Sequence, residues 1–144
     1  MMNYLELESL SEVDDMLKIH ISGSSNGFSG MANAYVNEQD FQVFCEELSG
    51  FPKVMEQTAS FNSGENEKLS YFELTFSCKD KAGNILVAIS IHEINSYINS
   101  PTKRFSSQFE FVTEPAELDR FQASLLHVCG PESVGNKARL NAKT

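Results

Sequence analysis

Between positions 71 and 91 the chain reads Tyr71-Phe72-Glu73-Leu74-Thr75-Phe76-Ser77-Cys78-Lys79-Asp80-Lys81-Ala82-Gly83-Asn84-Ile85-Leu86-Val87-Ala88-Ile89-Ser90-Ile91. Apolar residues recur at every second position up to Cys78 and again from Ile85, which is the period of a half-buried strand. The residues between them, Lys79 to Asn84, are polar and include a glycine, as is typical of a turn. The segment therefore predicts an antiparallel hairpin with one apolar face and one polar face.

The same two-residue period recurs on both sides of this hairpin. A turn or mobile loop, rich in Gly, Ser and Asn, is expected over residues 23–30, and a polar turn over 62–66. Further strands are predicted at Leu5 to Leu7, at 17–23, at Met31 to Val36, at about 54–61, and in the segment that contains Phe105, Phe109 and Phe111.

Two other segments have the three-to-four-residue period of amphipathic helices. Asn37 is a suitable N-cap for the first, which Gly50 and Pro52 should end. The second is expected to begin near Thr113-Glu114-Pro115 and to end at Gly130-Pro131. Their apolar stripes consist of Phe41, Phe44, Cys45 and Leu48 in the first helix, and of Leu118, Phe121, Leu125 and Val128 in the second.

The predicted element order is β-β-β-α-β-β-β-β-α, which places the chain in the α+β class. We expect an antiparallel sheet of about six to seven strands with the two helices packed on one face. Residues 1–130 should form a single domain, because a chain of 144 residues can bury a sufficient core without a metal or disulfide. Residues 131–144 have no apolar period and predict a flexible C-terminal tail.

Net charge is the most informative feature of the composition. The chain carries -9 in total, and residues 1–50 hold nine acids against one base, Lys18. Such a surface repels phosphate groups, so we expect neither nucleic acid nor a membrane as a partner. The charge instead favours a basic partner protein. An acidic surface that serves only solubility is the alternative.

The expected location is the cytoplasm. The first eight residues contain neither a basic leader nor a long apolar run, so no secretory signal is expected. The longest apolar run, Ile85 to Ile89, is far shorter than the ~20 residues of a membrane span. Cys45, Cys78 and Cys129 are widely spaced, which favours reduced thiols, and Cys129 should be the most exposed of them.

Two short motifs suggest catalysis but lack their required context. Gly23-Ser24-Ser25-Asn26-Gly27 matches the serine turn of α/β-hydrolases, yet a strand is predicted after it where a helix is needed. His92-Glu93 begins a zinc-protease motif whose second histidine is missing. The sequence thus supports no catalytic residue, no cofactor and no metal ligand, and it favours a protein without enzymatic activity.

The polar face of the predicted sheet is the best candidate for an interaction surface. It is either a docking platform or ordinary solvent-exposed surface, with a catalytic cleft as a third alternative. Acidic residues of the first helix would extend the surface. The candidate residues are Glu73, Thr75, Ser90, His92, Gln108 and Glu110 on the strands, and Glu38, Asp40, Glu46 and Glu47 on the helix.

Several spaced segments also resemble a group of known proteins. They are Gly27-Phe28-Ser29-Gly30, Phe41-x-x-Phe44-x-x-x-Leu48, the Phe72 to Cys78 strand, Gly83 to Val87, and Leu118 to Leu125. In these segments the chain resembles small uncharacterised bacterial α+β proteins, some of which resemble immunity proteins from polymorphic-toxin loci. The resemblance implies a cytoplasmic protein that binds and blocks a partner toxin, and it supplies no catalytic residue.

The leading hypothesis is therefore a non-enzymatic interaction domain, immunity-like, that binds a basic partner protein. The alternative is a small-molecule-binding domain or weak enzyme, with a pocket between sheet and helices or beneath the 23–30 loop. A homodimer formed through a strand edge or a sheet face is a third hypothesis.

Overall fold

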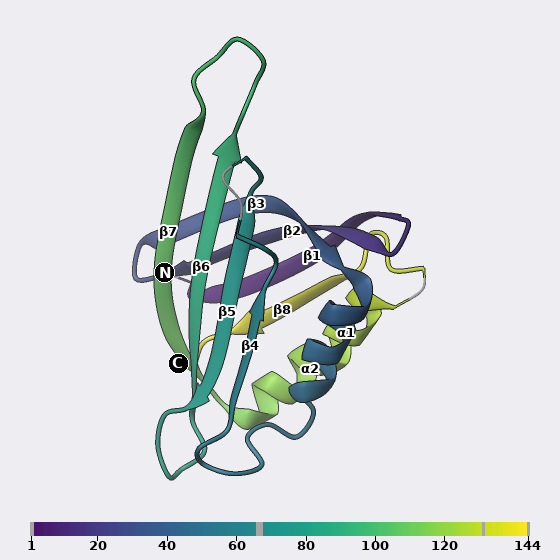
Figure 1. The fold of residues 1–144 in the computed structure, drawn as a ribbon. Helices are drawn as coiled ribbons and strands as arrows, with labels where there is room; N and C mark the ends of the chain where they lie inside the picture. The colour runs from purple at the N-terminus through teal and green to yellow at the C-terminus, as the bar shows by residue number, and fades with distance from the viewer. Residues whose placement is uncertain (1, 66–67, 131, 144) are drawn as a thin grey trace.

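Eight strands and two helices make up the computed structural model, which describes residues 2–65, 68–130 and 132–143 (Figure 1). The α+β class is confirmed. In chain order the elements are β1 (Tyr4–Val13), β2 (Met16–Ser25), β3 (Phe28–Asn37), α1 (Glu38–Glu47), β4 (Thr58–Asn62), β5 (Tyr71–Cys78), β6 (Ile85–Asn95), β7 (Lys103–Thr113), α2 (Pro115–Cys129) and β8 (Lys137–Asn141).

The strands form two antiparallel sheets of four, where the sequence predicts one sheet of six to seven strands. Sheet A has the order β3-β2-β1-β8 and sheet B has the order β4-β5-β6-β7. Antiparallel pairing is confirmed throughout, including the hairpin of β5 and β6. The two-residue period identifies each strand but does not say which strands pair, so the division into two sheets was not visible in it.

The two sheets pack face to face, and the strands of sheet A cross those of sheet B steeply (Figure 1). The helices lie inside this arrangement, beside the edge strands: α1 contacts β4, and α2 contacts β8. The inner face of each sheet is covered by the opposite sheet together with the helices, and not by the helices alone. Each sheet therefore keeps one outward face. Along each strand, the polar residues of this face alternate with buried residues that point inward.

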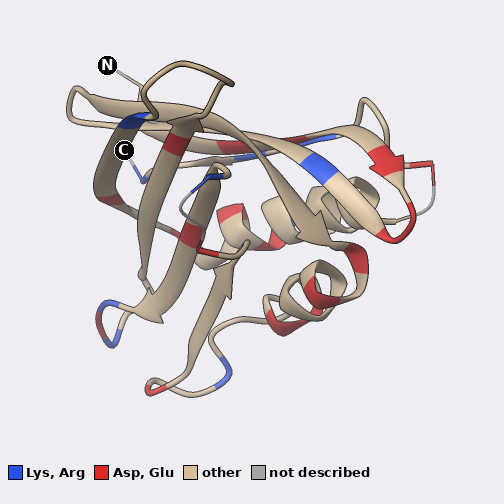
Figure 2. Cartoon of the chain, turned by 45° about the horizontal axis from the view of Figure 1, so that its top comes forward, with Lys and Arg blue, Asp and Glu red and all other residues tan. Residues whose placement is uncertain are grey.

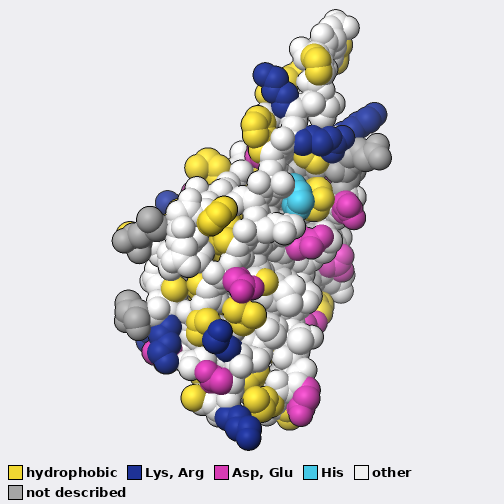
Figure 3. All heavy atoms as spheres, turned by 90° about the vertical axis from the view of Figure 1, so that its left-hand side faces the viewer, with side chains coloured by type: hydrophobic (Ala, Val, Ile, Leu, Met, Phe, Trp, Pro, Cys, Tyr) yellow, Lys and Arg dark blue, Asp and Glu magenta, His cyan; other side chains and the backbone are white. Residues whose placement is uncertain are grey.

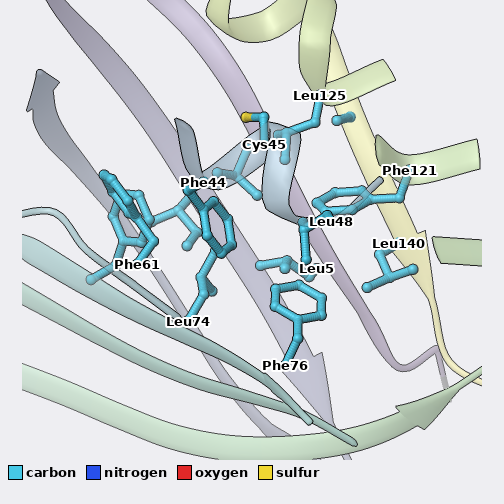
Figure 4. Close-up of a cluster of buried hydrophobic side chains, with 14 of the residues drawn as sticks. Leu5, Phe44, Cys45, Leu48, Phe61, Leu74, Phe76, Phe121, Leu125 and Leu140 are labelled. Carbon is cyan, nitrogen blue, oxygen red and sulfur yellow. The ribbon is translucent and has the colours of Figure 1, made fainter. Parts of the chain in front are cut away.

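Aromatic side chains fill the space between the sheets and the helices (Figure 4). The Phe61 ring lies 5.2 Å from the Phe41 ring, and the Phe44 ring lies 5.9 Å from the Phe76 ring. The predicted stripes of both helices are buried in this core. Asn37 caps α1 as expected, because its side chain accepts a hydrogen bond of 3.0 Å from the Asp40 amide.

The predicted loop over 23–30 is a tight hairpin. β2 continues to Ser25 and β3 begins at Phe28, so only Asn26 and Gly27 form the turn, with φ values of 51° and 89°. Gly23 has a different role, in packing. A Cβ atom there would lie 2.9 Å from the Phe109 ring, so glycine permits the close approach of sheet A to sheet B.

The predicted C-terminal tail contains β8, so the domain extends past residue 130. β8 pairs antiparallel with β1, and Ala138 and Leu140 are buried in the core. Ser133 before it is also buried, and its Oγ lies 3.1 Å from the Ser9 Oγ. Two residues of the predicted turns and helix ends, Asn66 and Pro131, lie outside the described residues.

One other boundary differs from the sequence prediction. The strand expected at 54–61 is β4, which begins at Thr58. β6 and β7 run on to Asn95 and Lys103 and form a long hairpin that projects beyond sheet A (Figure 1). We call residues 93–105 the arm. Neither helix of the described chain has the length and apolar character needed to span a bilayer.

Candidate interaction surface

The outward face of sheet B brings six of the sequence-predicted residues together. Pairing places Glu73 on β5 beside Ser90 on β6, and Ser90 beside Gln108 on β7. The next row consists of Thr75, Ala88 and Glu110. His92 lies at one end of these rows, opposite Tyr71.

A shallow groove runs along the middle of this face. The central strand carries the small side chains Ala88 and Ser90, whereas its neighbours carry longer ones. The difference in side-chain length leaves a depression of about 350 Å³ over β6. Its lining consists of Glu73, Thr75, Ala88, Ile89, Ser90, Gln108, Phe109 and Glu110.

The groove has acidic walls and no basic lining residue. Glu73 lies on one side and Glu110 on the other, and none of the lining residues is a lysine, arginine or histidine. Glu73 accepts a hydrogen bond of 2.8 Å from the Asn62 side chain, which holds its carboxylate in place. Within the described residues the Glu110 carboxylate has no hydrogen bond or ion pair. The arrangement suits a cationic group that approaches from solvent.

Two stacked rings lie in the row of residues next to one end of the groove. The Tyr71 and His92 rings are nearly parallel, with centroids 4.2 Å apart. His92 Nε2 also lies 2.8 Å from the Ser90 Oγ. Partial burial, together with the nearby carboxylates of Glu65 and Glu73, raises the pKa of the Tyr71 hydroxyl. The tyrosine therefore stays neutral at physiological pH.

The four candidate residues of α1 form a different surface. Glu38 and Asp40 lie in the first turn and Glu46 and Glu47 in the last, on a helix that packs against α2 and β4. Figure 2 shows acidic residues at the β1–β2 turn and along this helix. Burial and the neighbouring Glu12 and Asp15 raise the pKa of Glu38. We call Glu12, Asp14, Asp15, Glu38 and Asp40 the acidic corner.

Part of the N-terminal acidity is neutralised by the C-terminal strand. Arg139 Nη1 lies 3.2 Å from Glu6 Oε2, and Lys137 Nζ lies 4.0 Å from Glu8 Oε1. The Arg139 guanidinium also lies over the Tyr4 ring, 4.0 Å from its centroid. The sequence could not reveal this, because the pairs join residues more than a hundred positions apart.

The serine of the hydrolase-like motif has a structural role. Ser25 is buried, and its Oγ donates a hydrogen bond of 2.7 Å to the Glu110 carbonyl oxygen. The histidines lie apart: His20 bonds Asn33 on sheet A, His92 lies on sheet B, and His127 is exposed on α2. Across the described residues, no group of three His, Cys, Asp or Glu side chains could hold a metal ion.

Among the cysteines, Cys129 differs from its sequence prediction. It is buried together with Cys45, whereas Cys78 on β5 is partly exposed. Cys129 belongs to the last turn of α2, and that turn packs inward, so the glycine after it does not expose the thiol. A hydrogen bond to Cys129 and burial raise the pKa of the Cys45 thiol, which keeps it protonated.

Comparisons with protein-family models, with curated proteins and with solved structures gave no match to this chain. The geometry of the groove is therefore the basis for a proposed function. The sequence indicated its walls by strand parity, but not the small floor residue Ala88 or the flanking Tyr71 and Asn62. The positions of these three residues beside the groove depend on the register across β4, β5 and β6.

Proposed function

We propose that this protein is a non-enzymatic interaction domain, immunity-like, whose groove on sheet B binds basic side chains of a partner protein. The observation that carries the proposal is the pair of carboxylates, Glu73 and Glu110, on opposite walls of a groove that no basic residue lines. The net charge of -9 supports it, because a negative surface steers a basic partner toward the complex.

An arginine side chain fits the chemistry of this groove. Its planar guanidinium has several donors, and carboxylates, hydroxyls and amide oxygens accept from it. Glu73 and Glu110 would supply charge, while Ser90 and Gln108 would supply neutral acceptors between them. A partner that presents several basic residues would also use the acidic corner as a second, weaker contact.

The Ser90–His92 pair is the one observation that favours a small-molecule-binding domain or weak enzyme. A histidine 2.8 Å from a serine hydroxyl is the first element of nucleophilic catalysis. Such a histidine needs an orienting group, and no described carboxylate is hydrogen-bonded to it. Of the two places where this alternative expects a pocket, the space between sheets and helices is filled by the aromatic core. At the 23–30 segment Gly23 packs closely on Phe109, and only a notch of about 100 Å³ beside Ser29 and Gly30 stays open.

A short oligoarginine peptide provides a direct test of the groove. NMR titration should shift the amide signals of Ser90, Gln108 and their neighbours, and added salt should weaken the binding. The double variant Glu73→Gln and Glu110→Gln should abolish these shifts. The matched control, Glu46→Gln with Glu47→Gln, removes two acids from α1 and should leave the peptide-induced shifts unchanged.

Two results would count against the proposal. The first is a peptide that shifts only α1 and the acidic corner, and the second is a Glu73/Glu110 variant that binds as well as the wild type. A library of uncharged metabolites tests the alternative by thermal shift, because a ligand at 100 times its dissociation constant adds about 2.7 kcal/mol of stability.

A further inference from the structure

The edge strand β3 lacks the protection that the other sheet edges have. β4 and β8 each have only five residues and lie beside a helix. The β7 edge is partly closed, since the Glu110 carbonyl accepts from Ser25 Oγ and the Val112 carbonyl accepts from the Lys143 amide. β3 has ten residues and no such cover among the described residues.

Hairpin geometry identifies the backbone groups on the free edge of β3. The two-residue turn closes on Ser25 and Phe28, so this pair exchanges both hydrogen bonds, and every second pair after it does the same. The amide and carbonyl groups of the intervening residues point away from β2. These residues are Ser29, Met31, Asn33 and Tyr35.

The composition of β3 does not discourage pairing. Natural edge strands are commonly blocked by lysine, proline or a bulge, but β3 contains no charged residue and no proline, and its pairing with β2 is unbroken. Apolar side chains are instead exposed along it: Phe28 is 67% exposed, Met31 63% and Tyr35 50%.

The arm forms a second wall next to this edge. β3 crosses the inner side of β6 and β7, and the arm continues past it, so the inward face of the arm is not covered by sheet A (Figure 1). Figure 3 shows the arm projecting from the body of the molecule. Between β3 and the arm lies a notch of about 100 Å³, lined by Ser29, Gly30, Met31, Ile91, Glu93, Phe105, Ser106 and Ser107.

We propose that the β3 edge and the arm together form a docking slot for an extended segment of a partner protein, which adds to sheet A as a fifth strand. The edge groups of β3 would pair with its backbone, and Phe105, which is 57% exposed, would contact its apolar side chains. Glu93 has no ion pair within the described residues and is the only charged group lining the notch. The segment therefore carries alternating apolar residues and a lysine or arginine that meets Glu93.

A second copy of this chain fits the slot poorly. Antiparallel pairing of two β3 strands requires a two-fold axis perpendicular to the sheet, which places both copies of sheet B on the same side. Each arm would then enter the layer that β5, β6 and β7 of the other copy occupy. A single extended segment meets no such obstruction. This site is also independent of the groove, which lies on the opposite face of sheet B.

A synthetic peptide tests the slot without knowledge of the natural partner. The probe alternates valine and threonine over about eight residues, with a lysine at each end, and carries a fluorescent label. Binding by anisotropy should be accompanied by slower hydrogen exchange at Ser29, Met31, Asn33 and Tyr35. Met31→Pro removes an outward amide without breaking a bond to β2, and should weaken binding by at least about tenfold.

Further variants distinguish peptide binding at the slot from nonspecific apolar binding and from binding at the groove. Phe105→Ser should weaken binding, whereas Val54→Ser, a control that removes a residue of similar exposure (60%), should not. If Met31→Pro unfolds the chain, Met31→Lys replaces it as the edge-blocking variant. The Glu73→Gln, Glu110→Gln variant should bind the peptide normally, so a failure of either proposal is recognisable.

Three outcomes would overturn the inference: no binding up to about 1 mM peptide, binding unaffected by the edge and arm variants, or protection of amides outside β3. A dimer by light scattering that Met31→Lys dissociates would also overturn it, because it would make a second copy the occupant.

Discussion

At the scale of single residues, the surroundings of Glu38 act on its negative charge in opposite directions. It lies in the first turn of α1, where the helix dipole favours a negative charge. Burial and the carboxylates of Glu12 and Asp15 oppose that charge and raise its pKa above the ordinary value of 4.5. A carboxyl group with a raised pKa binds protons more readily in the folded state than in the unfolded state, so its stabilising effect is present at low pH.

Replacement of Glu38 should therefore change the pH dependence of stability. The contribution of Glu38 to the free energy of unfolding should fall as pH rises from about 4.5 through its raised pKa, since folding disfavours the ionised form. Glu38→Gln should remove this fall, which amounts to a few tenths of a kcal/mol. Urea unfolding at several pH values measures it, with Glu47→Gln as the control. Parallel curves for wild type and Glu38→Gln would contradict the prediction.

The sequence predicts individual residues well where the cause is local. Asn37 as a helix cap, and the buried parity of Phe72, Leu74 and Phe76, depend only on neighbours in the chain and are confirmed. The glycine after Cys129 predicts an exposed thiol. Its burial depends on the packing of α2 against α1 and β8, which no local pattern contains.

At the scale of elements, β8 joins the end of the chain to its beginning. Leu140 is fully buried beside Leu5, and Thr113 Oγ1 donates a hydrogen bond of 2.9 Å to the Asn141 carbonyl oxygen, which links β8 to sheet B as well. A strand of five residues thus contacts β1, β7 and α2.

Truncation of Leu140 tests the contribution of this strand. Leu140→Ala should lower the free energy of unfolding by about 2–5 kcal/mol, because it removes a buried side chain and leaves a cavity. Lys137→Ala, on the exposed side of the same strand, should change it by less than about 1 kcal/mol. Denaturant titration gives both values. Equal, small effects of the two changes would show that residues 132–143 do not belong to the core.

The strands with the most inward apolar residues were the most readily predicted from the sequence. β5 and β6 have four inward apolar positions each and were identified from the sequence, whereas β8 has two, Ala138 and Leu140, which alternate with Lys137, Arg139 and Asn141. The β2–β3 turn lies within the expected 23–30 segment, but it consists of Asn26 and Gly27 alone. Gly23, Ser24, Ser25 and Gly30 are strand residues with the composition of a loop. At Gly23 and Gly30 the close crossing of the sheets leaves little room for a side chain.

At the scale of the whole molecule, one core serves both sheets. Side chains from β1, β2, β5, β6 and both helices belong to a single buried cluster. Neither sheet could keep its apolar face buried if the other were lost. Sheets A and B are thus separate in their backbone hydrogen bonding, but both depend on the same core for their stability.

Unfolding should consequently occur in one transition. Far-UV circular dichroism reports the strands and helices. Tyrosine fluorescence reports Tyr4 and Tyr35 on sheet A, Tyr71 on sheet B and Tyr97 in the arm, and both signals should give the same midpoint in urea. Leu140→Ala should shift both signals together. Separate midpoints for the two probes would show that unfolding does not occur in one transition.

The pairing of β1 with β8 has a topological consequence. Tyr4 lies opposite Asn141, so the two ends of the described chain emerge side by side (Figure 1). A short linker could close the polypeptide into a ring without disturbing either sheet, and the ring could be reopened at the exposed tip of the arm, between Tyr97 and Asn99. Such a circular permutant would retain every strand pairing while its ends would lie at the point farthest from the core.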